Sequence, residues 1–263
     1  MGNLIKMELR RLFISKVFYI SMAIVAGVNI LLGVIVPILT RVFAPNQKVP
    51  DTDLSDLIMS PFSIPIMLVA VMISLVSFAY ADIANGYIKN IAGQVSHKND
   101  ILFSKFIVVG VHNYIFLLAA VISNIIGIAA GSVLGGSAIK VDGVFYIGSA
   151  FATLTIKWML LMAMSSILMF VIMGIRNKNI ASIVGVFLGT GVLALVYLGL
   201  NTGLSNIFKT NSVNINNFVP DQLFGTVNVA SGAYVINAVI VAIVCVVLFM
   251  ALTSKVFNSR DIK

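Results

Sequence analysis

Long apolar runs alternate with short polar segments along the chain. Six windows are apolar enough, and long enough, to cross a bilayer core about 30 Å thick, which takes about 20 residues. They span roughly 17–39, 62–80, 106–130, 145–174, 181–200 and 234–253. This pattern predicts an all-α integral membrane protein with six transmembrane helices. Six helices leave too little chain for a second folded domain, so residues 1–263 are expected to form one transmembrane domain.

A basic, amphipathic segment precedes the first window. Over residues 1–16, apolar side chains recur at helical spacing and charged side chains fill the remaining arc. This arrangement predicts an interfacial helix on the inner leaflet. The alternative is a charged start that only anchors the first span. The apolar positions are Leu4, Ile5, Leu9, Leu12 and Phe13, and the charged ones are Lys6, Glu8, Arg10 and Arg11.

The fourth window contains a charge. As a single helix, residues 145–174 would extend about 45 Å, with Lys157 in the middle. A lysine at the bilayer centre costs at least ~2.5 kcal/mol. We therefore expect Lys157 and Trp158 at the outer interface, a span over 158–174, and a shallow or re-entrant outer-leaflet helix over 144–156.

The last connection and the fifth window carry two further signals. Residues 201–233 form a long outer loop that mixes apolar residues with asparagines, which predicts short amphipathic helices in the outer leaflet, broken at Pro220. Gly185 and Gly189 form a small-xxx-small pair in the fifth window. Such pairs permit close helix contact, either within one subunit or between two subunits of a dimer.

Composition agrees with a membrane protein and its charge indicates an orientation. The chain is 60% hydrophobic and 10% charged, with a mean hydropathy of +1.07 and a net charge of +8. If both termini are cytoplasmic, twelve of the 17 Lys and Arg residues fall on the inner side and five on the outer side, as the positive-inside rule expects. The basic balance therefore indicates orientation rather than nucleic-acid binding. The single cysteine, Cys245, lies in the last window and forms no internal disulfide.

No enzymatic motif is present in the sequence. It lacks a phosphate-binding loop, a zinc-protease helix motif and a nucleophile elbow. His97 and His112 lie in different environments, and no set of metal ligands converges. We expect no catalytic residue, no metal and no cofactor in this chain. His112 beside Asn113 is interpreted as a packed polar pair. Ionisable groups deep within the spans are expected to be absent, which argues against a proton- or sodium-coupled carrier.

The segment between the second and third windows is longer than a turn requires. Over residues 82–104 it is polar and basic, yet Ile88, Ile91 and Val95 recur at helical spacing. It therefore predicts an amphipathic helix on the cytoplasmic side. Asp82 is placed at the membrane boundary, where a charge costs little.

This segment resembles the pattern of type-2 ABC transporter permeases. That family shows an acidic residue, then roughly G-T-x-K-N-x-L-x-x-G-x-S-R, then S-K leading into the third span. Among its members, the permeases of lantibiotic-immunity, bacitracin-resistance and peptide-export systems look most similar. In this chain, Asp82 replaces the usual glutamate and Tyr87 the threonine. The matching positions here are Asp82, Gly86, Tyr87, Ile88, Lys89, Asn90, Ile91, Ser96, Ile101, Ser104, Lys105 and Phe106.

The resemblance implies a mechanism. Such permeases pair with a second permease subunit, identical or paralogous, and bind two separate cytoplasmic ATPase subunits, which hold the ATP and Mg. The segment 82–104 would form a coupling helix seated in a groove of the ATPase. Ile88, Ile91 and Val95 would bury one stripe, and Asp82 would anchor the start of the helix. Polar contacts would come from Lys89, Asn90 and Lys98.

The function expected from this resemblance is ATP-driven export. The chain would be the permease subunit of an ABC exporter that expels an amphipathic peptide or antibiotic from the bacterial cell (inner) membrane, in bacteriocin immunity, antibiotic resistance or peptide export. The alternatives are a non-transport docking or sensor protein and a secondary carrier, the latter disfavoured because no internal repeat is evident. Methionine-rich spans suit an adaptable cargo surface. These methionines are Met67, Met72, Met162, Met164, Met169 and Met173.

Overall fold

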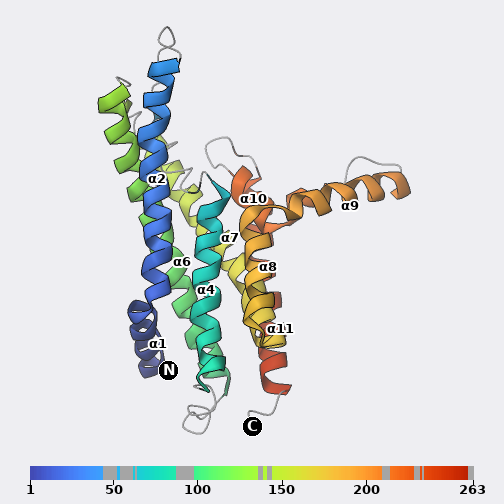
Figure 1. The fold of residues 1–263 in the computed structure, drawn as a ribbon. Helices are drawn as coiled ribbons and strands as arrows, with labels where there is room; N and C mark the ends of the chain where they lie inside the picture. Colours follow the sequence, from blue (N-terminus) through green and yellow to red (C-terminus); the bar gives the residue numbers. More distant parts are fainter. Residues whose placement is uncertain are drawn as a thin grey trace.

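A computed structural model gives the fold of the protein. It describes residues 1–43, 52–53, 62, 64–86, 98–135, 139–140, 144–208, 214–227, 232 and 234–259. This part of the chain is almost entirely helical, and its long helices run side by side (Figure 1). Strands β1 (Thr52–Asp53) and β2 (Ile139–Lys140) form a parallel pair. The helices are α1 (Gly2–Ile14), α2 (Lys16–Phe43), α4 (Pro65–Ala84), α6 (Lys98–Gly135), α7 (Val144–Ile175), α8 (Lys178–Thr190), α9 (Leu193–Phe208), the 3-10 helix η1 (Ile215–Phe218), α10 (Pro220–Thr226) and α11 (Val235–Ser259).

The helices α2, α4, α6, α7 and α11 each contain a stretch long and apolar enough to cross a membrane. The bent pair α8 and α9 raises the number of such spans to six if the pair is counted as one. The predicted all-helical, multi-pass architecture is confirmed at this level. The predicted N-terminal helix is also present, as α1, and Ser15 separates it from α2.

The fifth window is not the straight span that the sequence predicted. After only 13 residues α8 ends at Gly191, and α9 departs at an angle of 72°. Gly191 has a φ of 68°, a left-handed conformation that ends helices and suits glycine. Because the window is apolar throughout, hydropathy gave no sign of this bend. In Figure 1, α9 extends sideways, away from the bundle.

Within the predicted outer loop 201–233, the described residues include the end of α9, η1 and α10. Pro220 is the first residue of α10, where a missing N–H costs no helical hydrogen bond. The side chain of Asn201 in α9 joins the two parts of the loop. Its Nδ2 donates to Asn214 Oδ1 at 3.0 Å, and its Oδ1 accepts from the backbone N–H of Ile215 at 2.7 Å.

Helix α7 is continuous through Lys157, so the predicted break into a re-entrant segment and a shorter span is wrong. Its 32 residues extend about 48 Å. The Lys157 side chain is buried, with Nζ 5.3 Å from the centre of the Phe224 ring of α10. Trp158 contacts α6. Its indole N–H donates to the carbonyl of Gly110 in α6 at 3.0 Å. Packing of α10 and α6 against α7 therefore accommodates both residues within an unbroken helix.

Glycines allow two helix pairs to approach closely. In α6, a Cβ on Gly127 would lie 2.8 Å from the carbonyl oxygen of Asn29 in α2, and a Cβ on Gly33 of α2 would overlap the Gly127 backbone. In α8, a Cβ on Gly189 would lie 2.7 Å from the backbone nitrogen of Val69 in α4. Gly185 faces α4 as well, because a Cβ there would lie 3.3 Å from Cβ of Met72. The structure thus places both glycines of the predicted pair in a contact within the chain.

The methionines that suggested a cargo surface belong mainly to the core. Met67, Met72, Met164 and Met169 are fully buried, and Met173 is 4% exposed. The expectation of a methionine-lined surface is therefore wrong for these five. Only Met162 of the six is half-buried.

Four helix ends meet at one end of the bundle. In α1 and α4 and near the start of α6, charged side chains contact each other, as described below. The end of α11 joins them, because Ser254 Oγ and Asn258 Nδ2 donate to Asn99 Oδ1 of α6 at 3.1 and 2.8 Å. The N-terminus and the end of α11 lie at this end in Figure 1. We call it the terminal end of the bundle.

Candidate functional site

Asp82 lies in the last turn of α4, directly before the segment predicted to couple to an ATPase. Its side chain is completely buried. The sequence-based view that a charge at this boundary costs little is therefore wrong, because the carboxylate has lost its water. Burying a carboxylate is unfavourable unless cations and hydrogen-bond donors compensate for the lost hydration.

Two cations from different helices compensate Asp82. Arg11 of α1 ion-pairs with Oδ1, and Lys105 of α6 ion-pairs with Oδ2. The Lys105 side chain is 1% exposed, and its Nζ also lies 5.3 Å from the centre of the Phe78 ring. One carboxylate therefore ties the end of α4 to both the N-terminal helix and the start of α6.

Glu8 completes a group of two acids and two bases. Its carboxylate accepts from Nη1 of Arg11 at 3.3 and 3.4 Å, and its Oε2 lies 3.9 Å from Nζ of Lys105. Burial raises the pKa of the Glu8 carboxyl above its ordinary value of 4.5, and the Arg11 guanidinium partly opposes this shift. We call Glu8, Arg11, Asp82 and Lys105 the charge cluster.

The charge cluster is electrically balanced and mostly dry. Glu8, Asp82 and Lys105 are at most 2% exposed, while Arg11 is 24% exposed. A buried ion pair adds little net stability compared with a well-packed apolar core, but removing one partner costs about 3–5 kcal/mol. The relative positions of α1, α4 and α6 are therefore most sensitive to the loss of Asp82, which pairs with both cations.

The predicted coupling residues begin at this cluster. Gly86 has a φ of 64°, which ends α4 in the left-handed conformation. Residue Lys98 begins α6. Both ends of the 82–104 segment are therefore held by the cluster, through Asp82 at its start and Lys105 just after its end. The remaining predicted contacts lie outside the described residues: Tyr87, Ile88, Lys89, Asn90, Ile91 and Val95.

A second polar group lies within the bundle, between α4, α6 and α7. His112 is completely buried; its Nε2 lies 3.1 Å from Ser74 Oγ and its Nδ1 lies 3.1 Å from Asn113 Oδ1. Asn113 Nδ2 donates to Ser165 Oγ at 2.8 Å. This agrees with the packed polar pair expected at His112 and Asn113. Together with Lys157, however, His112 shows that ionisable side chains do occur inside the spans, so their expected absence is wrong.

Sequence reasoning found Asp82 but missed its partners. Glu8 and Arg11 were assigned to the lipid interface, although one face of α1 packs on α6 and buries Glu8 and Leu12. Lys105 was treated only as part of a motif. One usable signal is present in the sequence. Acidic and basic residues flank the start of the first apolar window, the end of the second and the start of the third, and these three ends must lie on the same side of the membrane.

Among the residues that the structure describes, no group of three or more His, Cys, Asp or Glu side chains could hold a metal ion. The charge cluster itself offers two carboxylates, both already occupied by Arg11 and Lys105. Its chemistry is therefore structural, holding helices together by charge. No protein-family model matches this chain, and neither a curated protein nor a solved structure matches it.

Proposed function

We propose that this chain is the membrane-spanning subunit of an ATP-driven exporter, coupled to a separate cytoplasmic ATPase through residues 82–104. The observation that carries the proposal is the double ion pair of Asp82 with Arg11 and Lys105. A segment that transmits force needs rigid attachment at both ends. The cluster supplies this attachment, since it joins the end of α4 and the start of α6 to each other and to α1.

The charge distribution supports placing the partner at the terminal end. There, basic residues of α1, of the α7–α8 junction and of the end of α11 accompany the cluster; they include Lys6, Arg10, Arg176, Lys178 and Lys255. An excess of Lys and Arg is typical of cytoplasmic ends. We infer a bacterial cell membrane with both termini in the cytoplasm, where ATP is available.

The cargo that we propose is an amphipathic peptide or antibiotic, expelled from the membrane in self-immunity, resistance or secretion. The apolar character of the spans supports this class. A partner permease, identical or paralogous, would complete the translocation path. ATP and Mg would be bound by the ATPase, and this chain would supply no catalytic group.

The test is to purify the protein from its own membrane in mild detergent and measure ATP hydrolysis by the complex. We expect a stoichiometric ATPase subunit with a phosphate-binding loop. Lys89→Glu, or deletion of residues 86–95, should uncouple hydrolysis from cargo, whereas Lys178→Glu should not. Lys178 is a matched control because it lies at the start of α8, outside the 82–104 segment, and receives the same change of charge. Absence of an ATPase, or hydrolysis indifferent to both 82–104 variants, would refute the proposal.

A further inference from the structure

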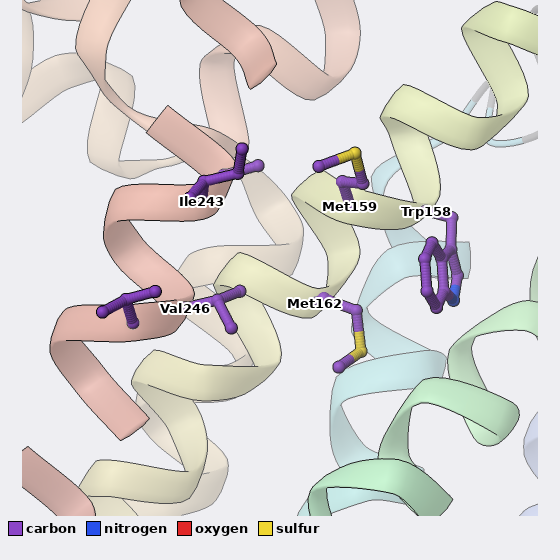
Figure 2. A pocket seen from close by; sticks show the side chains of 7 residues that line it. Trp158, Met159, Met162, Ile243 and Val246 are labelled. Carbon is purple, nitrogen blue, oxygen red and sulfur yellow. The ribbon is translucent and has the colours of Figure 1, made fainter. Parts of the chain in front are cut away.

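Three hollows on the surface of the spans share one residue, Trp158. One, of 230 Å³, lies between α7 and α11 and is shown in Figure 2, where Met159 and Met162 lie between Trp158 and the α11 residues Ile243 and Val246. The second, of 360 Å³, lies between α6 and α7. The third, of 530 Å³, is bordered by α6, α7 and α11.

These hollows form one groove. The first and third share Met162 and Val246, and the second and third share Tyr114. We call it the Trp158 groove. Its principal lining residues are Phe103, Gly110, Tyr114, Phe151, Met162 and Val246.

The groove runs along the helices for more than the thickness of one leaflet. Gly110 and Trp158 are hydrogen-bonded and mark the same level of the bundle. Phe103 lies seven residues from Gly110 towards the terminal end, and Phe151 lies seven residues from Trp158 in the opposite direction. At 1.5 Å per residue, the groove is about 21 Å long.

The groove is apolar along its length, and polar side chains lie one helical turn beyond its lining residues Phe103 and Met250. Flexible methionines, Met162 and Met250 among them, border it, and such side chains adapt to irregular apolar guests. At the terminal end stand the hydrogen-bonded side chains Asn99, Ser254 and Asn258. Asn99 precedes Gly110 by 11 residues, or about 16 Å of helix. That distance is close to half of a bilayer core about 30 Å thick.

We propose that the Trp158 groove binds one acyl chain of a membrane phospholipid from the leaflet at the terminal end. The headgroup lies beside Asn99, Ser254 and Asn258, and the methyl end of the chain lies beside Trp158. The distance of about 16 Å between the polar side chains and Trp158 matches the depth of one leaflet, and this match favours a phospholipid. A helix from a second copy is a poorer fit, because close helix contact in membranes relies on small residues, and among the lining residues only Gly110, Thr155 and Ala242 are small. The proposal does not rest on the proposed export function.

The chain contains one tryptophan, so its fluorescence reports on the groove alone. The full chain in a non-brominated detergent would be titrated with phospholipids brominated either near the headgroup or near the methyl end of the acyl chain. We expect saturable quenching at about one lipid per chain. Bromines near the methyl end should quench more strongly, because Trp158 lies about 16 Å from the polar end.

Filling the groove provides the second arm of the experiment. A Cβ on Gly110 would be in ordinary contact with Met162 at 3.6 Å and the Trp158 ring at 3.7 Å, so a leucine side chain would extend into the hollow. Gly110→Leu should abolish the saturable quenching. Gly27→Leu is the matched control, because Gly27 lies in α2 with nothing within 4 Å of a Cβ, and it should leave the quenching unchanged.

Several outcomes would overturn the proposal. Quenching that rises linearly with lipid would indicate bulk partitioning only. Stronger quenching by bromines near the headgroup would contradict the orientation. If the chain forms a dimer in which lipid does not quench Trp158, and Gly110→Leu dissociates that dimer, the groove would instead bind a second copy of the chain. The titration of the unmodified chain distinguishes saturable binding from bulk partitioning and determines the orientation of the lipid, even if Gly110→Leu fails to fold.

Discussion

Asp82 of α4 and Lys105 of α6 form an ion pair in which both side chains are almost completely buried, at 0% and 1% exposure. The two residues lie at the two ends of the predicted coupling segment. Their contact, together with that of Arg11 and Asp82, connects the N-terminal helix to both ends of the predicted coupling segment. Changes at this point should therefore affect stability and coupling together.

Asp82→Asn should lower the free energy of unfolding by about 3–5 kcal/mol, because Arg11 and Lys105 would keep their charges without a shared counter-ion. Thermal unfolding in detergent, followed by circular dichroism, measures the effect. Asp100→Asn serves as the control, since Asp100 is half-buried near the start of α6 and forms no ion pair with a described side chain. Equal losses in the two variants would contradict a special role for Asp82.

Glu8→Gln should be much milder than Asp82→Asn. Glu8 reaches Lys105 only at 3.9 Å and shares the partly exposed Arg11, so Asp82 remains to balance both cations. A loss as large as that of Asp82→Asn would show that the four charges act as one unit.

The pH dependence of stability should also change in Glu8→Gln. Because burial raises the folded-state pKa of Glu8 above its ordinary 4.5, the folded state binds more protons than the unfolded state in the interval above pH 4.5. The contribution of Glu8 to stability is fully present below pH 4.5 and is lost as the pH rises through the raised pKa. The difference in unfolding free energy between parent and variant, measured from pH 4 upwards, should show this loss. A difference that is flat with pH would contradict the shift.

Gly127→Ala should push α2 and α6 apart. Its Cβ would lie 2.8 Å from the carbonyl oxygen of Asn29 and from the Cα of Ile30, both backbone atoms that cannot rotate away. We expect a loss of about 1–3 kcal/mol, typical of overpacking. Gly27→Ala in the open part of α2 should instead be neutral or stabilising by up to about 1 kcal/mol, because alanine favours helix. Unfolding curves for the pair give the comparison directly.

Gly191→Ala should strain the bend between α8 and α9. A residue with a side chain at a φ of 68° costs roughly 1–2 kcal/mol. Gly199→Ala, within α9 and with no atom within 4 Å of its Cβ, provides a helical control that should not destabilise the protein. If Gly191→Ala unfolds at the same temperature as the parent, the bend does not depend on glycine.

Hydropathy predicted the number and approximate limits of the apolar segments, because burial in lipid requires long runs of apolar residues and little else. It could not predict the bend at Gly191, because the backbone conformation of a glycine does not change the mean hydropathy of the window. Lys157 was misplaced for a related reason. Its environment depends on Phe224, 67 positions later in the chain.

The site was predicted only in part. Asp82 was identified through its place in the motif, but its contacts with Arg11, 71 positions earlier, and with Lys105 are tertiary. Periodicity treats each helix separately and so assigned Glu8 and Arg11 to the lipid surface. Packing of α1 on α6 placed them against protein instead.

The 13 residues of α8 rise only about 20 Å, roughly 10 Å less than the hydrocarbon thickness of a typical bilayer. The neighbouring α9 leaves the bundle at that height with Leu195 and Leu198 73% and 66% exposed. Such hydrophobic mismatch is relieved when lipids next to a short segment compress. The protein should therefore thin the leaflet opposite the terminal end, beside α8. A thinner leaflet would lower the local free-energy barrier for an amphipathic molecule to leave the bilayer. Thiol labelling of cysteines at Leu195 and Leu198 by a membrane-impermeant reagent would detect the thinning, and complete protection of both would contradict it.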